Sequence, residues 1–178
     1  MGHTNIEIKA RTSKQDEIRK ILKKHNAEYI GTDSQINVYF NVKNGRLKLR
    51  KGIIENYLIY YDRINQEGPK QSDIVLYKSN LESALEQILT KALGILIVVD
   101  KKREIYFIDN VKIHLDKVKG LKKDFVEIEA IDSEGDIGKK RLLKQCRYYM
   151  KLLGIEQKDL IDCSYSDMFL REDKNDMD

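Results

Sequence analysis

Two short stretches of the chain carry charged residues at every second position. R-L-K-L-R places Arg46, Lys48 and Arg50 two residues apart, and F-V-E-I-E places Glu127 and Glu129 in the same way. Successive side chains of a strand point to opposite faces, so each row shares one face if the stretch is extended. Like charges about 7 Å apart along a strand repel each other. Each row therefore calls for a counter-ion.

The chemistry that suits both rows is the binding of a polyphosphate together with its metal ion. Paired carboxylates bind hard divalent cations such as Mg²⁺ or Mn²⁺ through oxygen. Rows of Arg and Lys bind phosphate oxygens. Further charged residues share faces of their own strands: Glu7 with Lys9, Lys101 with Arg103, Lys112 with His114 and Asp116, and Arg63 with two tyrosines.

For any single strand, a polar face in contact with water is the simpler interpretation. The set as a whole favours a different arrangement, because one strand is purely basic, another purely acidic, and the first carries both signs. If the strands curl into a barrel, the polar faces can line its interior while the apolar faces meet helices.

The elements that would position these residues follow from periodicity and turn residues. Strands are predicted at 5–11, 35–41, 46–50, 56–63, 73–78, 97–108, 111–118 and 124–132, and a loop at 67–72. Helices are predicted at 13–26, 81–93 and 138–153, with a short helical turn at 166–170. Helices between runs of mostly antiparallel strands give an α+β fold class.

The composition supports one globular domain over residues 1–170, followed by a disordered tail at 171–178. Of 178 residues, 41% are apolar and 35% are charged, yet the net charge is only +4. This modest charge, together with the acidic row, makes nucleic acid an unlikely partner. The longest apolar run, at 95–99, is too short to cross a membrane. Two cysteines, Cys146 and Cys163, fit a cytoplasmic protein with free thiols.

These motifs resemble the CYTH superfamily, which holds class IV adenylyl cyclases, thiamine triphosphatases and inorganic triphosphatases. The first strand of that family carries Glu-x-Glu-x-Lys, and this chain reads Asn5-Ile-Glu7-Ile-Lys9. R-L-K-L-R, D-K-K-R-E-I-Y-F, K-I-H-L-D and F-V-E-I-E follow in the expected order, so the resemblance covers residues 4–170. The closing L-G-I, D-L-I and S-Y-S-D-M resemble the class IV cyclase tail.

The resemblance implies a triphosphate tunnel: an eight-stranded antiparallel β-barrel with a polar interior and helices packed outside. It implies a cytoplasmic enzyme that uses Mg²⁺ or Mn²⁺, with Glu7, Lys9 and Glu127 as catalytic residues. The implied metal ligands are Glu7, Asp116, Glu127 and Glu129. The implied phosphate-binding residues are Lys9, Arg50, Lys101 and Arg103, with Arg46 and Lys48 as helpers.

Two positions depart from the family pattern. Asn5 replaces the first glutamate, which removes one metal-binding carboxylate. Tyr60 and Tyr61 stand where the cyclases carry a phosphate-binding lysine, and Arg63, on the face of Tyr61, is the expected substitute.

The favoured reaction is conversion of ATP to cyclic AMP and pyrophosphate. The alternatives are hydrolysis of inorganic or thiamine triphosphate, and a non-catalytic binder of polyphosphate or nucleotide. A homodimer stays open.

Overall fold

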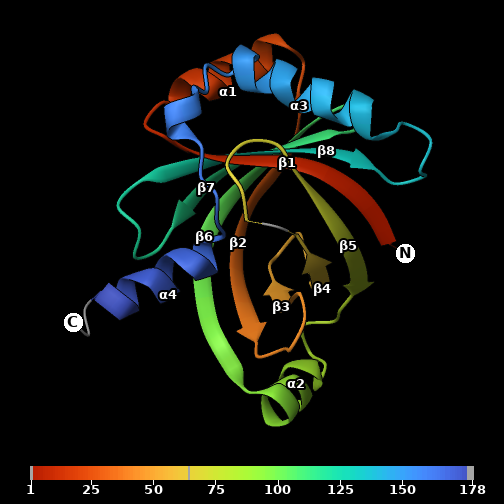
Figure 1. The fold of residues 1–178 in the computed structure, drawn as a ribbon, viewed down its shortest axis with the longest axis vertical. Coiled ribbons are helices and arrows are strands. Elements are labelled where there is room, and N and C mark those ends of the chain that lie inside the picture. The colour runs from red at the N-terminus through yellow and green to blue at the C-terminus, as the bar shows by residue number, and fades with distance from the viewer. Residues whose placement is uncertain (1, 64, 176–178) are drawn as a thin grey trace.

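The computed structural model describes residues 2–63 and 65–175 of the chain. Eight strands form one closed antiparallel barrel in the order β1-β5-β4-β3-β2-β6-β7-β8 (Figure 1). The strands are β1 (Gly2–Thr12), β2 (Glu28–Phe40), β3 (Arg46–Lys51), β4 (Tyr57–Asp62), β5 (Lys70–Lys78), β6 (Ile95–Ile108), β7 (Val111–Val118) and β8 (Asp124–Asp132). The expected α+β fold and the eight-stranded barrel are confirmed.

Alternation along β1 shows why the barrel has its polar face inside. Ile6, Ile8 and Ala10 are buried on the outer face, in the largest hydrophobic core. Glu7 and Lys9, on the opposite face, line the interior. Helices therefore cover part of the outer face of the barrel, while charged residues take the inner face.

Two helices share one side of the barrel, and the other two pack elsewhere on it (Figure 1). α1 (Gln15–Lys24) and α3 (Lys139–Leu152) lie over β1, β7 and β8, where Ile18, Leu22 and Leu142 join the main core. α2 (Leu85–Leu93) packs its leucines against Val38, Phe40 and Leu49 of β2 and β3. A 3₁₀ turn, η1 (Gln157–Asp159), leads toward the last helix, α4 (Tyr165–Asn175), which packs beside β6.

Several strand boundaries differ from the sequence-based prediction, including those of β2 and β5. β2 begins at Glu28 rather than near residue 35. Its first half pairs with β6 across an irregular register at Gly31, and its side chains there do not alternate simply between buried and exposed. β5 begins at Lys70, so the end of the predicted loop 67–72 belongs to a strand that pairs with β1. A strand whose side chains have mixed exposure shows no alternation of apolar and polar residues, so its ends cannot be predicted from that pattern.

Two helix boundaries differ as well. α2 begins at Leu85 instead of Leu81, whose side chain lies in a turn and is exposed. α4 extends to Asn175, well beyond the short turn predicted at 166–170. The first part of the expected tail 171–178 therefore continues a helix, and residues 176–178 lie outside the described residues. No helix among the described residues is long and apolar enough to span a membrane.

Candidate active site

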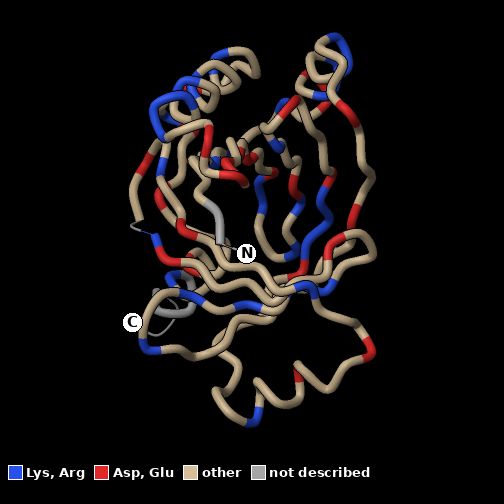
Figure 2. The backbone as a smooth tube through the Cα atoms, turned by 90° about the vertical axis from the view of Figure 1, so that its right-hand side faces the viewer, with Lys and Arg blue, Asp and Glu red and all other residues tan. Residues whose placement is uncertain are grey.

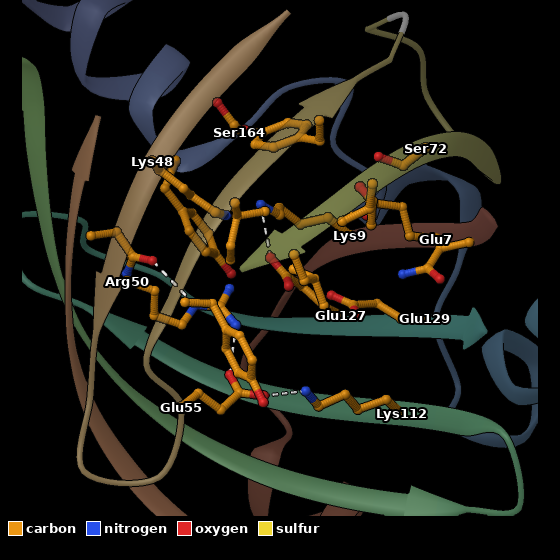
Figure 3. Close-up of a pocket in the computed structure, with 18 of the residues that line it drawn as sticks. Glu7, Lys9, Lys48, Arg50, Glu55, Ser72, Lys112, Glu127, Glu129 and Ser164 are labelled. Carbon is orange, nitrogen blue, oxygen red and sulfur yellow. Dashed lines mark hydrogen bonds and ion pairs between the residues drawn. The ribbon is translucent and has the colours of Figure 1, made fainter. Parts of the chain in front are cut away.

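The barrel contains a cavity of about 250 Å³ that is lined by charged side chains from most of its strands (Figure 3). Figure 2 shows where Lys and Arg, and Asp and Glu, lie along the backbone of these strands. Among the described residues, its basic lining is Lys9, Lys48, Arg50, Arg63, Lys101, Arg103 and Lys112. Its acidic lining is Glu7, Glu55, Glu127 and Glu129. The structure therefore brings together most of the site residues predicted from the sequence, and cations outnumber carboxylates.

Burial, together with the positive charge of neighbouring residues, lowers the pKa of two of the lysines. Burial lowers the pKa of Lys48 well below its usual value, and neighbouring Arg50 adds to the effect. Burial, with the charge of Arg103, lowers the pKa of Lys101 to about 7. A bound anion would favour the charged form of both lysines. The cavity is therefore suited to bind a polyanion from solution, because its own carboxylates are fewer than its cations.

Asp116 lies behind the cavity wall rather than on it. Its fully buried carboxylate accepts hydrogen bonds from Nε of Arg103 at 2.6 Å, from Lys101 at 3.4 Å and from the Tyr165 hydroxyl at 2.8 Å. Burial raises its pKa, but the positive charges of Arg103 and Lys101 outweigh burial and hold the pKa below its usual range. In this structure Asp116 fixes the two cations that face the cavity. Its role as a metal ligand stays a prediction.

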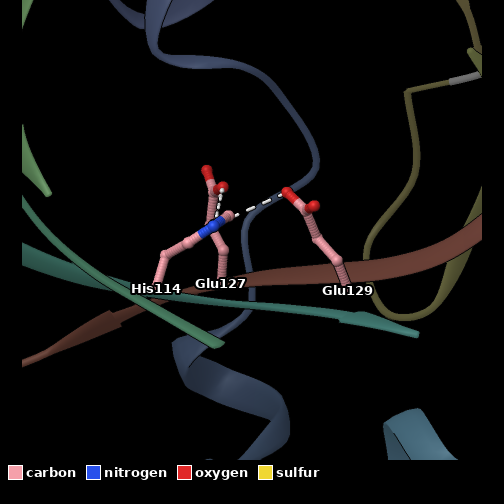
Figure 4. A group of neighbouring side chains, drawn as sticks. All are labelled: His114, Glu127 and Glu129. Atoms are coloured by element: carbon pink, nitrogen blue, oxygen red, sulfur yellow. Dashed lines mark ion pairs between the residues drawn. The ribbon is translucent and has the colours of Figure 1, made fainter. Parts of the chain in front are cut away.

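Glu127 and Glu129 lie side by side on β8 and meet His114 of β7 (Figure 4). Nδ1 of His114 is 3.4 Å from Glu127 and 3.5 Å from Glu129, and one ligand atom from each residue lies within 4.8 Å of the others. Among the described residues, neither ring nitrogen of His114 has a partner with the geometry of a hydrogen bond, although the side chain is fully buried.

Glu127 and the β1 residue Glu7 also form ion pairs with cations, and Asn5 replaces the other glutamate expected on β1. Glu127 also pairs with Lys9, at 2.8 Å, and with Arg103, at 2.7 Å. Glu7 forms an ion pair with Arg63 across the cavity. Asn5 lines the same cavity, and its buried side-chain oxygen has no hydrogen-bond partner. Arg63 thus stands in the cavity, as its parity with Tyr61 predicts.

These observations fit a divalent cation. Two adjacent carboxylates and a buried imidazole supply oxygen and nitrogen donors within 4.8 Å of one another. The amide oxygen of Asn5, which lines the same cavity as the two carboxylates, is a further donor without a hydrogen-bond partner among the described residues. Oxygen donors suit Mg²⁺, and Mn²⁺ also accepts imidazole. The residues present are therefore compatible with the metal predicted from the sequence.

Glu55 is a cavity residue that sequence reasoning missed (Figure 3). It lies between β3 and β4, where its carboxylate pairs with Arg50 at 2.5 Å and with Lys112 of β7. Burial raises its pKa, but the charges of Arg50 and Lys112 outweigh burial and hold the pKa far below its usual value. Glu55 belongs to no strand, so alternation could not reveal it.

The loop that presents Glu55 is held by a buried aspartate of β2. Asp33 accepts backbone N–H groups from Ile53, Ile54 and Glu55 at 2.6, 2.9 and 3.0 Å. Gln35 donates to Asp33 at 2.8 Å and to Glu55 at 3.0 Å. This arrangement fixes both the backbone and the side chain of Glu55 relative to the cavity.

Arg46 lies apart from the main basic lining. It pairs with Asp167 of α4 at 3.0 Å and lines a separate cavity between α4, β2 and β3. The start of α4 reaches the main cavity instead, where the ring of Tyr165 lies 3.6 Å from the ammonium group of Lys9, measured to the ring centre. The C-terminal segment therefore forms part of the site.

Comparison with known proteins agrees with this architecture. The model of the CYTH domain family matches residues 3–165. The PH1012 protein of Pyrococcus horikoshii OT3 is 26% identical, with a TM-score of 0.70 over 92% of this chain and 98% of its own. No curated protein matches the chain by sequence.

Two more distant structures share the fold. A candidate adenylate cyclase from Vibrio parahaemolyticus is 17% identical, with a TM-score of 0.70 over 95% of this chain and 99% of its own. HpAC1 of Hippeastrum, a candidate adenylyl cyclase with a dominant triphosphatase activity, is 14% identical, with a TM-score of 0.61 over 96% of both chains. Because the family model spans nearly the whole barrel, this chain belongs to the CYTH domain family.

Proposed function

We propose that this protein is a divalent-metal-dependent enzyme that binds a triphosphate inside the barrel and breaks one of its P–O bonds. The observation that supports this proposal best is the excess of cations over carboxylates in one cavity of the barrel, where burial, together with neighbouring arginines, lowers the pKa of Lys48 and Lys101. CYTH proteins are metal-dependent and include adenylate cyclase-like proteins and triphosphatases, so the family is consistent with this class of reaction.

The basic residues would hold the phosphate chain and neutralise charge as it develops. Arg50 and Arg103 offer planar guanidinium groups that suit two oxygens at once, while Lys9, Lys48 and Lys101 contribute point charges. Phosphoryl transfer depends chiefly on such positioning and on electrostatic stabilisation. Asp116 keeps Arg103 and Lys101 directed into the cavity before the substrate arrives.

Glu127 and Glu129 would hold the metal ion, with His114 beside them and Glu7 paired with Glu129 between β1 and β8. Asn5, which lines the same cavity, would offer a further oxygen. A bound Mg²⁺ or Mn²⁺ supplies charge neutralisation at the phosphate and a lowered pKa for the attacking oxygen. Lys9, which pairs with Glu127 at 2.8 Å, would orient a phosphate next to the metal site. The carboxylates are ionised in advance, since nearby cations hold the pKa of Glu127 low despite burial.

Cyclisation of ATP is the first reaction to test. The 3′-hydroxyl would attack the α-phosphorus, and pyrophosphate would leave against the row of basic residues. The tail motif S-Y-S-D-M favours this reaction, and Tyr165 of that motif lies in the cavity beside Lys9.

The test is a panel of ATP, inorganic triphosphate and thiamine triphosphate, each with Mg²⁺ and with Mn²⁺. Cyclic AMP plus pyrophosphate would establish the cyclase reaction, and orthophosphate would establish a hydrolase. Loss of product on chelation is expected in either case. Binding without product would contradict the enzymatic proposal and leave a binding protein.

A further inference from the structure

The cavity has a charged wall and an apolar wall. Its acidic and basic residues come from β1, β3, β6, β7, β8 and the loops that carry Glu55 and Arg63. Among the described residues, those that β4 and β5 contribute are all uncharged: Tyr57, Ile59, Tyr61, Ser72, Ile74 and Leu76. Charge on every strand would suit inorganic triphosphate, which is polar on all sides.

The apolar wall begins directly beside the phosphate-binding residues. Lys48 of β3 is paired with Ile59 of β4, and Ile59 is paired in turn with Leu76 of β5. Arg50 is likewise paired with Tyr57. Side chains paired across strands in this way have Cβ atoms about 5 Å apart. A group attached to a phosphate on Lys48 or Arg50 would therefore contact Ile59, Leu76 or Tyr57.

The orientation of β5 separates the cavity side chains from the outer ones. Ile74 and Leu76 are partly buried and line the cavity, whereas Val75 and Tyr77 are 52% and 64% exposed. Leu76 therefore has a close control in Val75, one residue away on the outer face.

We propose that the β4–β5 wall, formed by Tyr57, Ile59, Ile74 and Leu76, binds the organic ring of an organic triphosphate such as a nucleotide. Apolar contact and stacking on Tyr57 reward a planar ring. Inorganic triphosphate gains little there, because Ile59, Ile74 and Leu76 offer its oxygens no hydrogen-bond donor in exchange for water. This inference rests on the proposed triphosphate function and selects organic over inorganic triphosphates.

The experiment compares two non-reacting ligands that differ only in adenosine: bis-methylene ATP and bis-methylene triphosphate. Their Kd values are measured by calorimetry with Mg²⁺. The wild-type protein is expected to bind the adenosine compound about tenfold more tightly or better, as loss of an apolar contact in a pocket has effects of that size. Leu76→Ser should remove most of this preference while leaving the Kd of bis-methylene triphosphate unchanged, and Val75→Ser should keep the preference.

Equal Kd values for the two ligands in the wild-type protein would overturn the inference without any variant. Equal preferences in Leu76→Ser and Val75→Ser would overturn it as well, provided that both variants show the same cooperative thermal unfolding. If Leu76→Ser does not fold, Leu76→Asn and the wild-type comparison decide. Failure of both ligands to bind the wild-type protein would instead contradict the triphosphate function itself.

Discussion

Neighbouring acidic residues of the barrel have different environments, and the environment decides what each can do. Asp116 is fully buried and its oxygens are occupied by Arg103, Lys101 and Tyr165. Glu127 reaches the cavity, where it meets Lys9 and an imidazole without a hydrogen bond. Asp116, behind the cavity wall, can only position its cations, whereas Glu127, which also pairs with cations, lines the cavity and can contact a ligand there.

Replacement of the cavity carboxylate tests the proposed metal site at the scale of one residue. Glu127→Gln keeps the shape but removes the charge, so metal-dependent turnover is expected to fall by about 100-fold or more, as for loss of one stabilising group in an active site. The measurement is kcat at saturating Mg²⁺ or Mn²⁺, together with a circular dichroism spectrum that should match the wild type. Glu134→Gln, on the exposed loop after β8, is the control and should behave as wild type. Full activity in Glu127→Gln would remove the metal assignment.

At the scale of the element, the loop between β3 and β4 depends on a single buried cap. Asp33 of β2 holds three consecutive backbone N–H groups, and the third belongs to Glu55. Glu55 in turn fixes Arg50 and Lys112, which face the cavity from opposite strands. A change at Asp33 would therefore reach the phosphate-binding residues without touching them.

Asp33→Asn is expected to destabilise the protein by about 2 kcal/mol, because buried N–H groups lose charged acceptors. It should also raise the KM for a triphosphate roughly tenfold, since Arg50 loses its fixed position. Unfolding in urea and steady-state kinetics measure the two effects.

A second capping aspartate provides the control for this variant. Asp132 at the end of β8 accepts N–H groups from Gly135 and Gly138 in a similar loop, and its carboxylate does not line the cavity. Asp132→Asn should lower stability while leaving the KM unchanged. An equal rise in KM in both variants would show that the Asp33 loop has no specific effect on the site.

Elements with a clean two-residue period could be predicted from the sequence, and irregular ones could not. β7 and β8 begin and end where alternation placed them, at 111–118 and 124–132. Because parity assigns faces, the inward positions of Lys9, Arg50, Arg103 and Glu127 could be predicted as well. Glu55 could not, because its place depends on Asp33, 22 residues earlier, and on no local pattern.

The apolar wall was also out of reach of the sequence alone. Ile59 and Leu76 alternate as core residues do, so nothing in either strand indicates that they face the same cavity as Lys48. Only closure of the barrel places the uncharged inner faces of β4 and β5 opposite the charged inner faces of other strands.

At the scale of the whole molecule, the net charge of +4 conceals a separation between surface and interior. Charges of both signs on the outer surface balance, whereas the enclosed cavity holds more cations than carboxylates. Burial, and after it the positive charge of neighbouring arginines, lowers the pKa of Lys48 and Lys101. Binding of an anion should therefore be linked to uptake of protons by the protein.

Inorganic triphosphate binding at pH 8 is expected to be accompanied by proton uptake. Lys101 has a pKa of about 7 and is mostly neutral at pH 8, and an anion raises that pKa so that a proton is bound. Lys101→Arg, which stays protonated, should reduce the uptake by up to about one proton. Lys102→Arg, on the outer face of β6, is the control and should not change it.

Calorimetry in two buffers of different ionisation enthalpy, with a chelator to prevent turnover, gives the number of protons. At pH 6 Lys101 is already charged, so the difference between the two variants should largely disappear; an equal difference at both pH values would contradict the linkage.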